Sequence, residues 1–459
     1  MPLIRSISGL RATVDDSLTA ELISDYMSAL NTYLPAGPIV VGRDGRPSGI
    51  WIEKVISEKL SDFGREVRIL GVVPTPTVQL MVEKSDAVSG IAITASHNPA
   101  QWNGMKFINQ FGVFFDAEEN AKLWKILDSK SFDDTIAQNP GLIKTIDKAS
   151  EIHINNILNL PIFVNTPLID KIKSRKLKIV VDAVNASGSK FVPKLLKYFG
   201  VDVIELYCDS TGLFPHTPEP LPENLTALAQ AVINHKADLG IAVDPDADRL
   251  VLIDNNGSPI GEEKTIVLAA ATVLSSNEFL DNKYKPIVVV NHSTTRLVED
   301  LASQFEAKVI RSSVGEINVV GKMKASNAVI GGEGSGGVIL PHSHYGRDSL
   351  VGIALVLALL AKKEKTLSEI NDELPRYEMI KNKTPFSGDK KILYDAIKKS
   401  FSNSNINEED GLKIEFDKSW LQIRTSNTEP IIRIISEAPT KLEAINLVNK
   451  ALDILKNLM

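Results

Sequence analysis

The chain has 459 residues, of which 43% are hydrophobic and 24% are charged, and its formal net charge at pH 7 is -6. This length exceeds what one hydrophobic core usually organises, so we expect about two to four domains in a soluble globular protein. The negative charge disfavours nucleic-acid and anionic-membrane partners, which bind basic surfaces, but it allows a small anionic substrate where cations gather locally.

The chain shows no pattern expected of a secreted or membrane-spanning protein. Its N-terminus lacks the charged start and the apolar stretch of a signal peptide, and its longest apolar run, residues 350–361, reads better as a buried helix than as a membrane span. Cys208 is the only cysteine, so it cannot form an internal disulfide, and we expect a buried thiol. A cytoplasmic location is the simplest expectation.

Short β-branched runs alternate with stretches of helical period through most of the chain, which predicts α/β units with mostly parallel sheets. Such strands bury both faces, as these apolar runs require. The expected strands fall into three groups: 38–44, 66–73 and 90–97; 176–184, 201–208 and 237–244; and 285–293, 307–313 and 327–335.

The C-terminal part has a different pattern. Residues 411–438 read as two or three adjacent strands joined by tight turns, and a helix is expected over 441–459, so we predict a smaller α+β domain there. Polar or turn-rich segments interrupt the alternation of strands and helices near residues 148, 254 and 370. We therefore expect four domains, at 1–148, 149–254, 255–370 and 371–459.

Residues 93–107 form the first segment with candidate reactive residues, because a β run leads into a turn that holds Ser96. A serine at the carboxyl end of a parallel strand lies where open α/β sheets bind ligands. His97 suggests a hydrolase triad, but neighbours in an extended chain point to opposite sides and no G-x-S-x-G elbow surrounds Ser96. Lys106 could transfer a proton if its pKa were depressed. A turn without chemistry is the alternative.

Three carboxylates, Asp244, Asp246 and Asp248, alternate immediately after an expected strand. Carboxylates this close repel one another unless a cation joins them. An EF-hand is excluded, because its glycine and glutamate positions are occupied by Arg249 and Asn255. Three carboxylate ligands would leave coordination positions open on the ion, which suits Mg²⁺ because it often shares its shell with phosphate oxygens. An acidic solvent turn is the alternative reading.

Residues 331–349 formally contain a G-x-G-x-x-G pattern, but a proline and two histidines follow where a dinucleotide site needs a helix, so we reject that match. The glycines favour a loop that admits a ligand closely, with Glu333 and Ser335 offering hydrogen bonds to sugar hydroxyls. A plain turn is the alternative. We assign no role to His342 or His344.

Residues 421–434 gather a guanidinium, two hydroxyls and an amide in a single turn. A forked cation with neutral donors is an inventory for binding phosphate, although a generic hairpin turn would also explain it. The residues concerned are Arg424, Ser426, Asn427 and Thr428.

These segments, T-A-S-H-N-P…N-G-x-K, D-P-D-A-D-R, G-E-G-S-G-G and R-T-S-N-T-E-P, resemble in their order the α-D-phosphohexomutase superfamily, and the resemblance covers essentially the whole chain. It implies four domains around a central cleft. Three of them would be α/β domains with mixed, mostly parallel sheets, and the last would be a smaller α+β domain. Each domain would lend one motif to the cleft.

The resemblance also implies roles for individual residues. Ser96 would carry the phosphoryl group, and Lys106 would be a proton shuttle near it. The implied catalytic set is Ser96, Lys106, Arg11 and His97; the implied metal ligands are Ser96, Asp244, Asp246 and Asp248; the implied substrate-binding residues are Arg249, Gly315, Glu316, Glu333, Ser335, Arg424, Ser426, Asn427 and Thr428.

The implied reaction interconverts the 1- and 6-phosphates of a hexose. Phosphoserine at Ser96 would donate its phosphoryl group to the free hydroxyl, and the sugar 1,6-bisphosphate would turn over in the cleft before Ser96 takes the other phosphate back. The implied cofactors are a single Mg²⁺ and a sugar 1,6-bisphosphate as activator. The expected partner is a hexose phosphate, with the chain as a monomer or homodimer.

The chain departs from the family pattern in places that bear on the sugar. Ala12 stands where glycine is commoner, and Gly337 stands where bacterial relatives often carry histidine. The phosphate loop resembles the phosphomannomutase/phosphoglucomutase branch, whereas the sugar loop resembles phosphoglucosamine mutases. We lean to glucosamine phosphate, with glucose or mannose phosphate as the alternative. A catalytically idle sugar-phosphate binder and a metal-dependent phosphatase are the competing classes.

Overall fold

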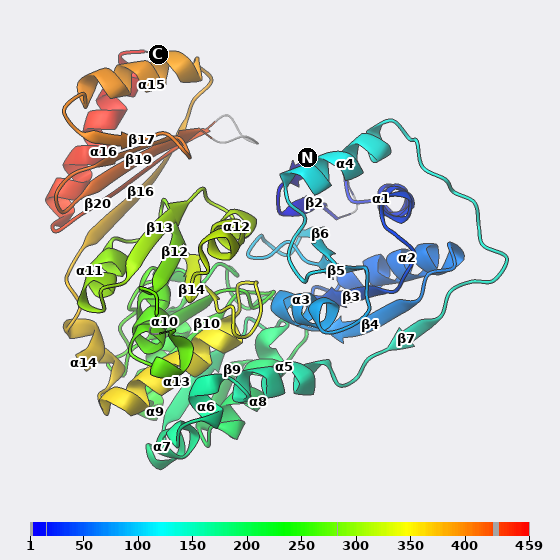
Figure 1. The fold of residues 1–459 in the computed structure, drawn as a ribbon, viewed down its shortest axis with the longest axis horizontal. Helices are drawn as coiled ribbons and strands as arrows, with labels where there is room; N and C mark the ends of the chain where they lie inside the picture. The colour runs from blue at the N-terminus through cyan, green and yellow to red at the C-terminus, as the bar shows by residue number, and fades with distance from the viewer. Residues whose placement is uncertain (1–2, 15, 282, 426–430, 459) are drawn as a thin grey trace.

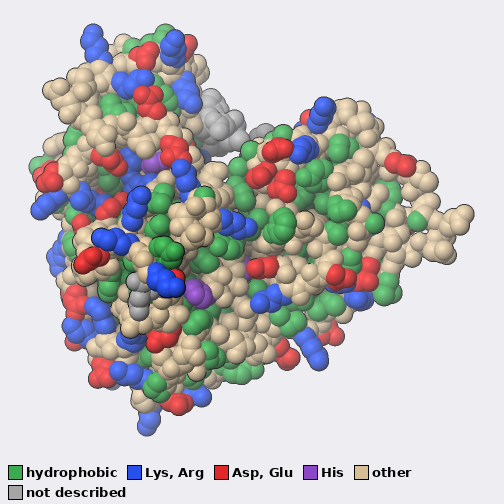
Figure 2. Space-filling model, in the orientation of Figure 1, with side chains coloured by type: hydrophobic (Ala, Val, Ile, Leu, Met, Phe, Trp, Pro, Cys, Tyr) green, Lys and Arg blue, Asp and Glu red, His purple; other side chains and the backbone are tan. Residues whose placement is uncertain are grey.

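The computed structural model describes residues 3–14, 16–281, 283–425 and 431–458, and it shows four units, each built on its own β-sheet (Figure 1). We call these units domains I to IV in chain order. Domain IV lies apart from domain I in Figure 1, and Figure 2 shows a notch in the surface between them. Within the described ranges, no helix is long and apolar enough to cross a bilayer.

Domain I holds a seven-stranded sheet in the order β1-β2-β6-β5-β3-β4-β7. Along β3, Ile39 and Val41 face one apolar cluster and Val40 faces another, so both faces of the sheet are buried. The strands are β1 Ile4–Ser6, β2 Gly9–Thr13, β3 Ile39–Arg43, β4 Val67–Val72, β5 Ser89–Ile93, β6 Trp102–Asn109 and β7 Ile143–Thr145; the helices are α1 Ala20–Tyr33, α2 Gly49–Asp62, α3 Thr75–Glu83 and α4 Ala117–Asp128.

Domains II and III each hold a four-stranded sheet. In domain II the strands are β8 Lys178–Asp182, β9 Asp202–Tyr207, β10 Leu239–Val243 and β11 Leu250–Ile253; the helices are α5 Ala149–Leu158, α6 Pro161–Val164, α7 Leu168–Ser174, α8 Gly188–Tyr198, the 3-10 turn η1 Pro222–Asn224 and α9 Thr226–His235. In domain III the strands are β12 Ile287–Asn291, β13 Lys308–Ser312, β14 Ile330–Glu333 and β15 Gly337–Ile339; the helices are α10 Lys264–Leu274, the 3-10 turn η2 Asn277–Phe279, α11 Leu297–Gln304, α12 Glu316–Ser326, α13 Ser349–Lys363 and α14 Leu367–Asp372.

Domain IV is an antiparallel sheet in the order β16-β20-β19-β18-β17, with two helices. Its strands are β16 Glu378–Pro385, β17 Asn405–Asn407, β18 Leu412–Glu415, β19 Trp420–Thr425 and β20 Ile431–Ala438; its helices are α15 Lys390–Ser400 and α16 Lys441–Lys456. The predicted fold class, three α/β domains followed by a C-terminal α+β domain, is confirmed.

The first three domains repeat one strand order. The order β6-β5-β3-β4 in domain I recurs as β11-β10-β8-β9 and as β15-β14-β12-β13. In each sheet the two central strands are parallel: β5 and β3, β10 and β8, and β14 and β12. The strand that follows along the chain, β6, β11 or β15, pairs antiparallel at one side of them. The motif loops lie between β5 and β6, β10 and β11, and β14 and β15, and the loop of domain IV lies between antiparallel β19 and β20. The returning antiparallel strand is a feature that the sequence pattern did not predict.

A single apolar core joins domains I, II and III. It includes Val82 of α3, Ile154 of α5, Leu196 of α8 and the whole buried face of α13. Helix α13 contains the apolar run 350–361, and it is buried within the protein as expected. Cys208 is half-buried against this core rather than fully buried, and burial raises the pKa of its thiol to about 12.

Domain IV has a separate core and meets domain III through polar groups. Ser293 donates to the side-chain oxygen of Gln422 at 2.6 Å, and Lys413 donates to the carbonyl of His292 at 2.8 Å. Lys381 of β16 pairs with Glu262 and Glu263, which precede α10, at 2.9 Å each. Charged and polar contacts therefore dominate this joint.

Candidate active site

Ser96 lies in the turn that follows β5, with a left-handed backbone at φ 50° and only 1% of its surface exposed. Its backbone N–H donates to the Thr94 hydroxyl at 2.8 Å, and its Oγ donates to Oδ2 of Asp244 at 3.0 Å. Ser96 of domain I therefore touches the acidic loop of domain II directly.

Arg46 holds this turn from behind, and the sequence analysis did not identify it. Its buried guanidinium donates to the carbonyls of Ser96 at 2.5 Å, Asn98 at 2.7 Å and Pro99 at 2.9 Å, and it pairs with Asp44 at 2.9 Å. A planar fork with five donors suits such a set of carbonyls. The signal was present, because Asp44 and Arg46 follow β3, the neighbour of β5 in the sheet.

His97 is placed differently from the expectation for an extended chain. Because Ser96 is left-handed, the next side chain turns back, and His97 Nδ1 lies 3.3 Å from Ser96 Oγ. The other ring nitrogen lies 3.7 Å from Oε1 of Glu219. The charge of Arg249, together with burial, lowers the pKa of His97 well below its usual value. A neutral imidazole beside Ser96 can accept its proton.

Asp244, Asp246 and Asp248 lie in the loop between β10 and β11, all with no exposed surface. Burial and repulsion from the other two carboxylates raise the pKa of Asp244 well above its usual value. Asp246 has the opposite shift: burial is outweighed by Lys106 and by the Thr75 hydroxyl, which donates to Oδ2 at 2.7 Å, so its pKa is lowered.

This loop fits a divalent cation. Oxygens of the three aspartates lie within 4.8 Å of one another, and Oδ1 of Asp246 and Oδ1 of Asp248 are buried with no hydrogen-bond partner among the described residues. Buried carboxylate oxygens are normally paired, so unpaired ones that converge indicate an ion. All-oxygen ligands match Mg²⁺.

Lys106 donates to Oδ2 of Asp246 at 2.6 Å and lies 3.5 Å from Oδ2 of Asp248. Burial disfavours its charged form, but the two carboxylates outweigh burial, and its pKa is raised. The proton-shuttle expectation requires a depressed pKa, so the shift runs in the other direction. The proton-shuttle role of Lys106 stays a prediction.

Arg11 and Arg249 add positive charge above Ser96. Arg11 donates to the side-chain oxygen of Asn98 at 2.9 Å, and burial lowers its pKa. Arg249 Nε lies 3.8 Å from Oδ1 of Asp248 and forms no hydrogen bond within the described residues. Both arginines line the cavity described below, so both can reach a phosphate there.

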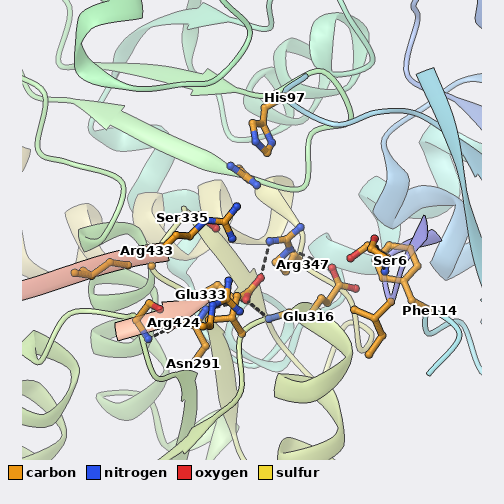
Figure 3. A pocket seen from close by; sticks show the side chains of 18 of the residues that line it. Ser6, His97, Phe114, Asn291, Glu316, Glu333, Ser335, Arg347, Arg424 and Arg433 are labelled. Atoms are coloured by element: carbon orange, nitrogen blue, oxygen red, sulfur yellow. Dashed lines mark hydrogen bonds and ion pairs between the residues drawn. The ribbon is translucent and has the colours of Figure 1, made fainter. Parts of the chain in front are cut away.

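A cavity of about 590 Å³ joins all four domains. From domain III it is lined by Gly315, Glu316, Glu333 and Ser335, as the sequence analysis expected, and also by Arg347 (Figure 3). Glu333 ends β14, and its Oε1 accepts from the Asn291 amide at 2.8 Å and from the Gly315 N–H at 2.9 Å.

Arg424 reaches the cavity from the end of β19, and Arg433 lies directly opposite on β20. Both line the cavity in Figure 3. Arg424 Nη1 lies 3.5 Å from Oδ2 of Asp410, and two guanidiniums that line one cavity also suit a phosphate. Arg433 was not identified from the sequence. Ser426, Asn427 and Thr428 lie outside the described residues.

The chain matches all four domain families of phosphoglucomutase/phosphomannomutase: α/β/α domain I over 4–134, domain II over 151–257, domain III over 262–377 and the C-terminal domain over 380–454. A phosphoglucomutase/phosphomannomutase of Thermococcus kodakarensis is 35% identical over 447 residues, covering 95% of this chain and 94% of that protein. A probable phosphoglucosamine mutase of Pyrococcus horikoshii is 32% identical over 458 residues, covering 98% and 97%.

Solved structures agree with this match. A phosphoglucomutase/phosphomannomutase family protein of Burkholderia thailandensis superposes with a TM-score of 0.85 at 25% identity, covering 99% of this chain and 98% of that one. A putative phosphomannomutase of Thermus thermophilus gives a TM-score of 0.83 at 22% identity, covering 99% of each. With its four domains, its serine and aspartate loops and these relatives, the chain belongs to the α-D-phosphohexomutase superfamily.

Proposed function

We propose that this protein interconverts hexose 1-phosphate and hexose 6-phosphate through phosphoserine at Ser96 and a sugar 1,6-bisphosphate. The observation that carries the proposal is the contact of Ser96 Oγ with Asp244 at 3.0 Å, beside His97, which lines a cavity that Arg424 and Arg433 also line. A reacting serine next to a cavity with separate cations suits a substrate that carries phosphate at one end and reacts at the other.

Asp244, Asp246 and Asp248 would hold Mg²⁺, which when bound neutralises charge on the phosphoryl group being transferred. Arg11 and Arg249, which line the cavity, would bind oxygens of that group. These fixed charges orient the phosphorus for in-line attack, which is the main requirement of phosphoryl transfer.

In the transfer, the bond between phosphorus and Ser96 Oγ breaks as a bond from the sugar hydroxyl oxygen to phosphorus forms. The hydroxyl proton leaves the sugar, and Ser96 Oγ ends the step protonated. His97, neutral and with Nδ1 3.3 Å from Oγ, is placed to take the proton from the sugar hydroxyl and pass it to Ser96 Oγ as the bond to phosphorus breaks. The second half-reaction runs the same step in reverse with the other end of the bisphosphate.

For the sugar we favour glucosamine phosphate. Glu263, Glu316 and Glu333 line the cavity, but Lys381 and Arg347 already pair with them, so the lean to glucosamine rests on the names of similar proteins. Several similar proteins carry matching names, among them a phosphoglucosamine/phosphogalactosamine mutase of Sulfurisphaera tokodaii at 32% identity over 450 residues. Glucose and mannose phosphates are the alternative, in keeping with the name of the Thermococcus relative.

The test is ³¹P NMR of the purified protein with Mg²⁺ and, in parallel, glucosamine 6-phosphate, glucose 1-phosphate and mannose 1-phosphate, each primed with its 1,6-bisphosphate. We expect 1- and 6-phosphate signals to interconvert, fastest for glucosamine phosphate, with no net release of inorganic phosphate. Ser96→Ala should abolish the exchange, and Ser326→Ala, on the surface of α12, should leave it unchanged.

Other outcomes separate the competing classes. Steady release of inorganic phosphate would show a phosphatase. Tight binding of the sugar phosphates without interconversion in any of the three samples would show an idle binder, and both results contradict the mutase proposal.

A further inference from the structure

Arg347 follows the sugar loop and contacts three acidic side chains, which come from the start of α12, the end of β14 and the loop between β10 and β11. Its Nε donates to Oε2 of Glu316 at 3.1 Å, its Nη1 to Oε2 of Glu333 at 2.6 Å, and its Nη2 to Oδ2 of Asp248. The guanidinium is buried and its pKa is raised well above the usual value, since the charges of Asp248, Glu333 and Glu316 outweigh burial. Figure 3 shows its contacts to Glu316 and Glu333.

Gly337 leaves the room that the Arg347 side chain occupies. A Cβ at position 337 would lie 2.3 Å from Arg347 Cδ and 3.0 Å from Cγ, far inside normal contact. Those atoms cannot move aside freely, because the guanidinium beyond them is held in three ion pairs. The absence of a side chain at 337 and the presence of Arg347 are therefore parts of one arrangement.

The backbone that carries Arg347 is itself fixed to the other domains. The next residue, Asp348, caps α13 through Oδ1 and accepts from His153 of α5 at 2.7 Å and from His344 at 3.1 Å through Oδ2. The other nitrogen of His153 bonds the Thr77 hydroxyl of α3 at 2.8 Å. Residues of domains I, II and III thus meet at this point.

The contacts of Arg347 decide which oxygens remain for ligands. On Asp248, Arg347 takes Oδ2 and leaves Oδ1 with no hydrogen bond among the described residues, 3.8 Å from Arg249 Nε. On Glu316, the second oxygen accepts from Gln79 at 2.9 Å, so this carboxylate cannot rotate. One side chain thus sets the orientation of a metal ligand and of two residues of the sugar-binding wall.

We propose that Arg347, accommodated by Gly337, is a positioning residue that couples the metal loop to the sugar-binding loops. The inference rests on the proposed function for the identity of the ligands. It assigns to Arg347 an effect on Mg²⁺ affinity and on sugar-phosphate affinity together, which a residue needed only for stability would not have.

Two substitutions test this by different routes. Arg347→Lys keeps the positive charge but removes the fork, and Gly337→Ala keeps the fork but displaces it. Mg²⁺ affinity is measured by isothermal titration calorimetry without sugar, and KM and kcat are measured in the mutase assay. We expect Mg²⁺ Kd and KM to rise about tenfold or more in both variants, as for other residues that orient a metal ligand.

Matched controls separate positioning from folding. Arg65→Lys alters another buried arginine that donates to backbone carbonyls in domain I, and Gly321→Ala adds a Cβ on α12 where nothing lies within 4 Å. Neither should change Mg²⁺ Kd or KM, although Arg65→Lys should lower the melting temperature.

Unchanged Mg²⁺ Kd and KM in Gly337→Ala would overturn the inference, even if Arg347→Lys failed to fold. A loss of Mg²⁺ affinity in Arg65→Lys as large as in Arg347→Lys would overturn it too, since the effect would then follow stability. The calorimetric arm needs no turnover, so it decides the role of Arg347 at the metal loop even if the mutase assay finds no interconversion.

Discussion

The interfaces among domains I, II and III are apolar, whereas the interface between domain III and domain IV is polar. Domains I, II and III share one apolar core, in which Val82, Ile154 and Leu355 belong to a single cluster, whereas domain IV has its own core around Leu421 and Ile434. A polar interface between domains permits relative motion, and a shared apolar core resists it. The loops that hold Ser96, Asp244 and Ser335 therefore lie on one body, and Arg424, for which we propose phosphate binding, lies on another.

The difference has a direct use in the proposed reaction. The bisphosphate must reorient between the two half-reactions. Its non-reacting phosphate must then leave its binding site while the residues around Ser96 keep their positions. A mobile domain IV can release Arg424 from the sugar phosphate without disturbing Asp244 or Arg347, whose partners all belong to the shared body.

The largest effect is expected from breaking the shared body at Asp348. Asp348→Ala leaves two buried imidazoles without their acceptor and α13 without its cap, so we expect a loss of about 4 kcal/mol in the free energy of unfolding, measured by urea denaturation. Asp372→Ala, at the end of α14, is the exposed control. A loss no greater than that of the control would show that the cluster does not join the domains.

A second pair of variants tests whether domain IV unfolds by itself. Ile434→Ala should reduce the free energy of unfolding of domain IV by about 3 kcal/mol and lower the temperature of its transition. Leu355→Ala should lower the temperature of the transition of domains I to III through a similar loss. Differential scanning calorimetry reports both. A single transition that shifts equally in both variants would contradict the separation into two bodies.

The smallest effect is expected at the polar joint and depends on pH. Burial, opposed by Lys381, raises the pKa of Glu263 from 4.5 to about 7. A carboxyl whose pKa is raised on folding stabilises the protein while it is protonated, so stability is lost as pH rises from about 4.5 to about 7. Glu263→Gln should remove this loss, which is on the order of 2 kcal/mol.

Melting temperatures across that pH range measure the effect, with Glu21→Gln on the exposed surface of α1 as the control. A wild-type curve parallel to that of Glu263→Gln between those pH values would show that Glu263 is already ionised at the lower end, against the expected sign.

Local signals in the sequence were sufficient for the fold class and for the acidic loop. The strands showed as β-branched runs, and Asp244, Asp246 and Asp248 lie within five residues of one another, so their proximity needed no tertiary information. The geometry of His97 could not be predicted, because it depends on the left-handed backbone of Ser96. A rule for extended chains placed it on the wrong side.

Residues whose partners are distant in sequence were the hardest to predict. The pKa of Lys106 depends on Asp246, 140 residues away, and the orientation of Arg347 depends on Asp248, 99 residues away. Arg347 and Arg433 lie inside segments 331–349 and 421–434, which the sequence analysis singled out, but it gave neither residue a role. Their roles follow from which loops the repeated strand order brings to the same cavity.

Each motif loop is closed by the antiparallel pair that carries it, so its ends stay about 5 Å apart whatever residues lie between them. A substitution inside one loop can then change what the loop touches while the strands of the other three keep their places. Such an arrangement would let exchanges in the turn between Glu333 and Gly337 change sugar preference without moving the turn after Ile93. Comparing natural variants that differ in that turn alone would trace how one reaction came to serve several sugars.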